Sequence, residues 1–67
     1  MADYRFYRLS AGRILDAEVR DCASDEEAHR SARDILEAAT AICDAIEIWQ
    51  LARLVGTVRR TDPPQAA

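Results

Sequence analysis

The side chains of this 67-residue chain that could do chemistry are two cysteines, one histidine and a few serines. Cys22 and Cys43 stand on either side of a predicted helix. That helix has about 16 residues and is roughly 24 Å long. A disulfide needs Cα atoms within about 7 Å, so we expect two free, partly buried thiols. A bridge between two chains is the alternative. Two distant cysteines and one histidine also lack the paired ligand spacing of a zinc site.

The single histidine, His29, falls on the predicted helix, with Glu26 one turn before it and Arg33 one turn after it. General acid–base catalysis needs a positioned partner and a pocket. No serine, cysteine or aspartate can be placed against His29, so we expect it at the surface or at the edge of the core. The serines, none of which stands in a nucleophile motif, are Ser10, Ser24 and Ser31. We therefore predict no catalytic residue, no metal, no cofactor and no enzymatic activity.

The acidic run Asp25-Glu26-Glu27 suggests a metal site or the start of a helix. It lacks the alternating oxygen ligands and the glycine of a calcium loop. Ser24 before the run and Glu27 within it form a capping-box pattern, and acids suit the positive end of the helix dipole. We therefore predict a helix over about residues 25–40. Its apolar stripe is mostly alanine and consists of Ala28, Ala32, Ile35, Leu36 and Ala39.

Strands are predicted on both sides of this helix. Residues 4–9 are rich in aromatic residues, and residues 13–22 alternate between apolar and polar side chains, so they form a hairpin with a turn at Gly12. Residues 45–51 and 53–60 form a second hairpin, with a turn near Leu51-Ala52. Neither of those two residues favours positive φ.

Gly56 lies inside the last of these strands and indicates a bulge or a close backbone approach. The order ββαββ predicts an α+β fold, a four-stranded antiparallel sheet of order 2-1-3-4 with one helix packed on one face. Residues 1–60 form one domain. Residues 61–67, which contain two prolines, are predicted to be a disordered C-terminal tail.

One helix cannot cover all the apolar residues of this sheet. The side chains expected under the helix are Leu15, Ala17, Val19, Ile46 and Ile48. The side chains expected on the opposite face, which form the predicted interface, are Tyr7, Leu9, Trp49, Leu51 and Val55. An aromatic face rimmed by arginine and glutamate has the composition of an interface core and rim. We therefore expect a homodimer that forms through the sheet face or an exposed sheet edge. In the alternative, Trp49 and one tyrosine simply cover each other on a solvated sheet.

The charge balance argues against binding to nucleic acid or to a membrane. All nine basic residues are arginine, and the net charge is -3. Arginine beside tyrosine and tryptophan on a sheet is typical of single-stranded nucleic-acid platforms, so a nucleic-acid-binding accessory protein is the alternative function. The strands carry nearly as many acids as arginines, which disfavours it. No apolar run reaches the roughly 20 residues of a membrane span, and no signal-peptide pattern is present, so we expect a cytoplasmic protein.

Five short segments of the chain are Tyr4-Arg5-Phe6-Tyr7, Gly12-Arg13-Ile14, Ser24-Asp25-Glu26-Glu27-Ala28, Ile46-Glu47-Ile48-Trp49-Gln50 and Arg53-Leu54-Val55. With these segments, residues 4–60 resemble a set of short, uncharacterised bacterial ββαββ proteins. The order and spacing of several short segments carry the resemblance, and the chain departs from it at Leu51-Ala52, where a glycine or aspartate is usual. The resemblance implies the fold but no activity, cofactor or catalytic residue. Binding to an unidentified protein partner is an alternative that the sequence leaves open.

Overall fold

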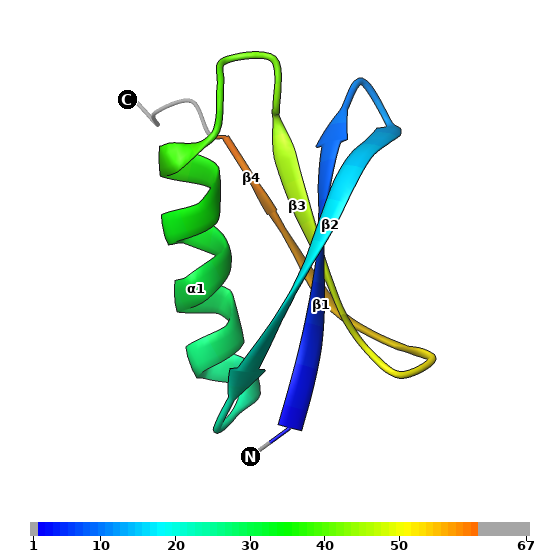
Figure 1. Ribbon diagram of the computed structural model, residues 1–67, viewed down its shortest axis with the longest axis vertical. Coiled ribbons are helices and arrows are strands. Elements are labelled where there is room, and N and C mark those ends of the chain that lie inside the picture. Colours follow the sequence, from blue (N-terminus) through cyan, green and yellow to red (C-terminus); the bar gives the residue numbers. More distant parts are fainter. Residues whose placement is uncertain (1, 61–67) are drawn as a thin grey trace.

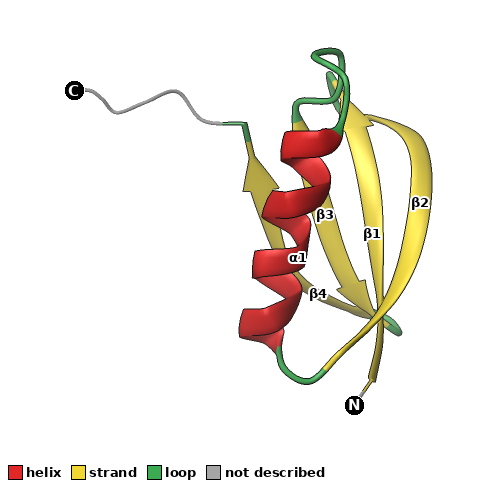
Figure 2. Ribbon diagram, turned by 60° about the vertical axis from the view of Figure 1, so that its left-hand side comes forward, coloured by secondary structure: helices red, strands yellow, loops and turns green. Residues whose placement is uncertain are grey.

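The computed structural model describes residues 2–60 and has the element order ββαββ (Figure 1). The elements are β1 (Ala2–Ser10), β2 (Arg13–Cys22), α1 (Asp25–Ala38), β3 (Ala45–Gln50) and β4 (Arg53–Arg59). The strands form one antiparallel sheet in the order β2-β1-β3-β4, and α1 covers one face (Figure 2). The predicted α+β fold and strand order are therefore confirmed. The predicted tail, residues 61–67, lies outside the described residues.

The start of α1 is capped as predicted. The Ser24 hydroxyl oxygen accepts a hydrogen bond from the Glu27 N–H at 3.2 Å, and the Glu27 carboxylate accepts one from the Ala23 N–H. These bonds satisfy two N–H groups that would otherwise lack a partner near the first turn. The helix ends at Ala38, two residues before the predicted end.

The end of α1 is held by a residue far away in the sequence. No basic side chain lies in the last turn of the helix. Arg60, just after β4, donates instead to the carbonyl oxygens of Leu36 at 3.1 Å, Thr40 at 3.3 Å and Cys43 at 2.9 Å. A cation at this position also complements the negative end of the helix dipole. Arg60 therefore links the last strand to the helix and the following loop.

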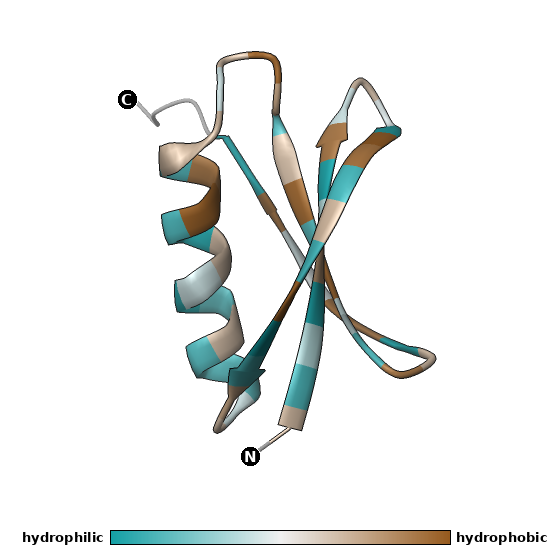
Figure 3. Ribbon diagram, in the orientation of Figure 1, coloured by the Kyte–Doolittle hydropathy of each residue, from teal (hydrophilic) through white to brown (hydrophobic). Residues whose placement is uncertain are grey.

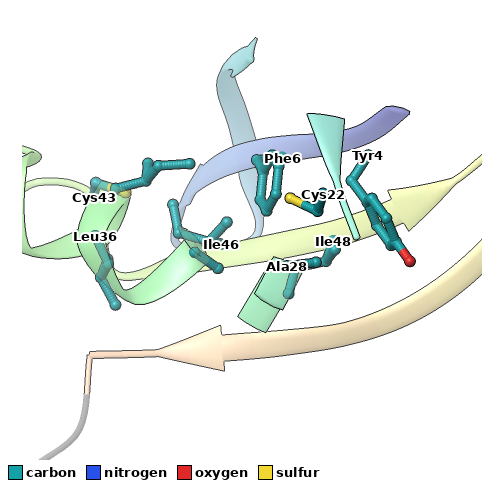
Figure 4. Packing of buried hydrophobic residues seen from close by; sticks show 10 residues of the cluster. Tyr4, Phe6, Cys22, Ala28, Leu36, Cys43, Ile46 and Ile48 are labelled. Carbon is teal, nitrogen blue, oxygen red and sulfur yellow. The ribbon is translucent and has the colours of Figure 1, made fainter. Parts of the chain in front are cut away.

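The core lies between α1 and the two central strands. Phe6, Ile46 and Ile48 are completely buried there, and Figure 4 shows them gathered with Leu36 and Ala28 of the helix. Apolar and polar residues alternate along the strands, and the apolar side of α1 faces the sheet (Figure 3). Because the helix presents mainly small alanines near its start, its backbone can approach the sheet closely.

The prediction for the buried face is right for β3 and wrong for β2. Ile46 and Ile48 lie under the helix, whereas Leu15, Ala17 and Val19 are exposed. The register explains the difference, because Ala17 and Val19 pair with Tyr7 and Arg5, which lie on the face away from α1. Leu15, which has no partner at the β1–β2 bulge, lines a hollow beside Ile35 and Ala38 of α1 but stays 46% exposed. The rest of the helix side of β2 carries polar residues, and only Cys22 enters the core.

The two features predicted as alternatives at Gly56, a bulge and a close backbone approach, are both present. The β3–β4 register shifts between Ile48 and Trp49, and this bulge leaves Val55 without a direct partner next to Gly56. A Cβ atom at Gly56 would lie 2.6 Å from Cε1 of His29. The imidazole of α1 therefore rests on the backbone of β4, which places His29 at the edge of the core.

The two hairpin turns differ in their chemistry. Ala11 and Gly12 both have positive φ, at 52° and 81°, as a tight two-residue hairpin turn requires. The second turn contains no glycine and places Leu51 at a φ of 55°. This conformation costs an L-residue, Leu51 here and Ala11 in the first turn, about 1–2 kcal/mol. The predicted turn position is confirmed, and its unfavourable residue type is accommodated by backbone strain at Leu51.

Candidate functional site

The face of the sheet away from α1, here called the open face, carries the only tryptophan and one of the two tyrosines. Trp49 and Tyr7 are both half-buried there. The Trp49 indole N–H donates to the Glu47 carboxylate at 2.9 Å, and the Arg5 guanidinium donates to the Tyr7 hydroxyl at 3.4 Å. These neighbouring polar groups orient the rings across the surface of the sheet.

Exposed apolar side chains continue this surface to both sides. A shallow hollow of about 290 Å³ is lined by Tyr7, Ile14, Glu47, Trp49 and Leu51. The large apolar residues exposed on or beside this face are Ile14 at 60%, Val19 at 58%, Leu51 at 95% and Leu54 at 49%. Such a concentration of exposed apolar area is typical of an interaction surface rather than of solvated sheet.

Most residues of the predicted interface lie together on the open face. Tyr7, Leu9 and Trp49 share it, because they occupy alternate positions of paired strands, and Leu51 follows in the adjoining turn. Val55 does not join them. The bulge turns its side chain to the helix side, where it packs against the core, and Leu54 takes the position opposite Trp49.

Three exposed apolar residues of this surface were missed from the sequence: Ile14, Val19 and Leu54. Val19 was assigned to the buried side because alternation shows that a strand has two faces without showing which one is covered. Gly56 was the sequence signal that could have placed Leu54 on the open face. A bulge beside this glycine changes the sheet face to which the preceding residues point.

A row of charged side chains follows the helix side of β2, beyond the cover of α1. Arg8 donates to Asp16 at 2.8 Å and to Glu18 at 2.8 Å, and Arg20 donates to the other oxygen of Glu18. Arg20 first, and then Arg8, hold the pKa of Glu18 below its usual value. The Asp16 and Glu18 carboxylates in turn raise the pKa of Arg8. The row balances its charges within the chain.

A second ionic group ties the first strand, the helix start and the last strand together. The Tyr4 hydroxyl donates to Asp25 at 2.8 Å, and Arg53 donates to both oxygens of that carboxylate at 3.1 and 3.2 Å. Arg53 and, after it, Tyr4 lower the pKa of Asp25 from its ordinary value of 3.8. The same hydrogen bond to Asp25 raises the pKa of Tyr4.

These carboxylates predict a loss of stability in acid. Asp25 and Glu18 have lower pKa values in the folded chain, so the unfolded chain binds protons more readily. The free energy of unfolding should be constant at neutral pH and should fall once the pH drops below about 4.5 and through the lowered values. Thermal unfolding followed by circular dichroism from pH 7 to pH 2 measures this. Asp25→Asn should show a smaller fall, and Asp34→Asn, whose carboxylate makes no hydrogen bond within residues 2–60, should match the parent. An equal fall in Asp25→Asn and the parent would contradict the assignment.

Both cysteines are free thiols and are more deeply buried than the partial burial predicted from the sequence. The Cys22 sulfur lies 3.9 Å from the Ser31 hydroxyl, and the Cys43 thiol donates to the Ala45 carbonyl at 3.6 Å. Within residues 2–60, no three histidine, cysteine or acidic side chains stand close enough to hold a metal ion. The thiols therefore act as small core residues.

Comparisons with protein-family models, with curated proteins and with solved structures found no match. The resemblance to bacterial ββαββ proteins stays a prediction. Within residues 2–60, no helix is long and apolar enough to cross a membrane.

Proposed function

We propose that this protein is a small, non-enzymatic interaction protein that forms a homodimer through its sheet. The observation that carries the proposal is the position of Val19. This side chain is 58% exposed in the middle of an edge strand, on the face that the helix leaves open. A β-branched side chain at a free strand edge is available to a second chain both through its apolar surface and through its backbone.

The small core gives a physical reason to associate. A single core in a chain of this length rarely supplies more than about 3–5 kcal/mol of net stability. Burying exposed apolar surface adds roughly 25 cal/mol for each Å² removed from water. Association would therefore add stability that the monomer cannot obtain from its own core.

The molar mass in solution tests this proposal. Size-exclusion chromatography with light scattering should give about twice the chain mass of 7.5 kDa, with dissociation on dilution. Val19→Asp should shift the protein to the monomer, because a carboxylate would have to lose its water in the contact. Ala41→Asp places the same charge in the exposed loop after the helix and should leave the mass unchanged. A monomer at every concentration would overturn the proposal.

A nucleic-acid-binding role is the second candidate, and it draws support from Arg5 beside Tyr7 on the same face as Trp49. Acidic groups share that face, including Glu47 and the paired Asp3 and Asp21, which disfavours phosphate binding. Because Trp49 is the only tryptophan, its fluorescence reports on this surface directly. Titration with a single-stranded oligonucleotide at low salt should leave the emission unchanged, and a saturable quenching would favour the second candidate.

A cytoplasmic location in a bacterium is part of the proposal. Two buried, unbridged thiols suit a reducing compartment. If the chain instead binds a different protein, the same open face is the surface that we expect it to use.

A further inference from the structure

The sheet has two free edges, and they are unequal. β2 forms one edge with 10 residues, and β4 forms the other with 7. Figure 2 shows β2 curving away from the helix, so its outer side is open. β4 contains Gly56 and exposes one large apolar residue, Leu54, whereas β2 exposes three, Ile14, Leu15 and Val19. β2 is therefore the better edge for adding a strand.

The direction of the β2 backbone groups follows from one hydrogen bond in β1. The Asp44 N–H donates to the Leu9 carbonyl at 2.9 Å, so the Leu9 peptide groups point toward β3. Peptide groups alternate in direction along an antiparallel strand, so those of Arg8 and Phe6 point toward β2 and bond to Asp16 and Glu18.

The residues between these bonded positions are Ala17, Val19 and Asp21. By the same alternation, their N–H and C=O groups point outward, where no strand of residues 2–60 lies beside them. Three alternate residues of β2 thus present a free ladder of backbone donors and acceptors.

The charges beside this ladder select one register. Glu18 and Arg20 project from the helix side of β2, and their side chains are 29% and 41% exposed. When two copies of β2 pair antiparallel with Val19 opposite Val19, each Glu18 faces the Arg20 of the other copy. Sliding one copy by two residues places Glu18 against Glu18 or Arg20 against Arg20. Opposite charges stabilise cross-strand pairs and like charges destabilise them.

The geometry points to a dimer in which two copies join edge to edge through β2, centred on Val19, to form one continuous antiparallel sheet. This inference rests on the proposed self-association and names the surface that performs it. The outward backbone groups of Ala17, Val19 and Asp21 bond across the edge. The two Val19 side chains meet on the open face, while the Glu18 and Arg20 pairs close the helix side.

Charge exchange tests the register. Glu18→Arg and Arg20→Glu each place like charges across the edge, and each alone should weaken the dimer by about tenfold or more in its dissociation constant. An equal mixture of the two variants restores opposite charges in both pairs, so it should form a heterodimer as tightly as the parent dimer. Sedimentation equilibrium measures the dimer dissociation constant of each variant and of their mixture. If the mixture stays as weak as the single variants, the register is wrong.

A control separates this inference from the wider proposal. Leu51→Asp tests the rest of the open face, away from the β2 edge. Ala41→Asp, in the exposed loop after the helix, is the control that should leave the dimer dissociation constant unchanged. A dimer that is lost in Leu51→Asp but kept in the two charge variants would overturn the edge pairing and leave self-association standing. A parent protein that is monomeric would overturn both.

Cross-linking gives a second readout that does not depend on Glu18, which also binds Arg8 and Arg20 within its own chain. Directly opposite residues in a hydrogen-bonded antiparallel pair have Cα atoms about 5.5 Å apart, within the range of a disulfide. Val19→Cys should therefore give a covalent dimer on mild oxidation, seen on a non-reducing gel. Thr57→Cys, on β4, should form no covalent dimer under the same conditions and should run as a single chain on the gel. A Val19→Cys chain that does not cross-link while the protein is dimeric would overturn the edge pairing.

Discussion

Phe6→Ala leaves most of the chain unfolded at 25 °C: this is the largest effect that we expect from a single substitution. Phe6 has no exposed surface and stands in the central strand β1. Removing a buried phenylalanine side chain costs about 3–5 kcal/mol. A single core of this size supplies about the same amount. Urea unfolding followed by far-ultraviolet circular dichroism should therefore show little folded baseline.

The matched control is Tyr7→Ala, which removes an aromatic ring from the neighbouring position of the same strand on the open face. Since the Tyr7 ring is half-buried, its loss should leave a cooperative transition at a moderately lower urea concentration. A Phe6→Ala chain that unfolds at the parent midpoint would show that the core is not where the structure places it.

Arg60→Ala is expected to lower the free energy of unfolding by about 1–2 kcal/mol. The substitution removes the bonds from the guanidinium to the Leu36, Thr40 and Cys43 carbonyls. Hydrogen bonds to a charged group contribute more than neutral ones, and contact with solvent keeps the effect at the lower end of their range. For a domain this small, each kcal/mol should lower Tm by about 4–8 °C.

Arg59→Ala is the control for this effect. It removes the adjacent arginine, which is exposed and makes no hydrogen bond or ion pair with another described side chain. Tm should therefore change little. Amide hydrogen exchange adds a local readout, because the last turn of α1 should exchange faster in Arg60→Ala only. Equal effects of the two substitutions would mean that net charge matters and that the carbonyl contacts do not.

The helix and both hairpins could be predicted because each depends on local chemistry. Ser24 and Glu27 cap the helix through backbone groups a few residues away. Gly12 supplies one of the two positive φ angles of the first turn. With these elements placed, the return of the chain across the sheet leaves few arrangements, so the strand order could also be derived.

The exposed side of β2 could not be predicted, because it depends on which strands the helix covers. The alternation of apolar and polar residues shows that β2 has two faces, and the apolar face was predicted to lie in the core. In the structure, the short helix packs mainly against β3 and β4 and leaves most of β2 uncovered. The charged Glu18 and Arg20 therefore occupy the helix side of β2, and Val19 is exposed on the open face. The position of the helix leaves the candidate site exposed. Because that position is a tertiary feature, the local sequence pattern of β2 does not reveal it.

Val55 and Arg60 escaped prediction for a related reason. Val55 faces the core because a bulge adds a residue to one strand, and a two-residue period cannot register that shift. The Arg60 side chain meets carbonyls of residues 36–43, a contact between distant parts of the chain. Local patterns carry no information about either feature.

The strand order also has a kinetic consequence. The two hairpins pair neighbouring segments, and such units form in about 1–10 μs. The β1–β3 ladder instead joins Leu9 to Ala45 across the whole helix, so closing it costs more chain entropy. We expect this closure to be the rate-limiting step of folding. Phe6 and Ile48 pair directly within that ladder, so their contacts should already be formed in the transition state, while the outer strands still fluctuate.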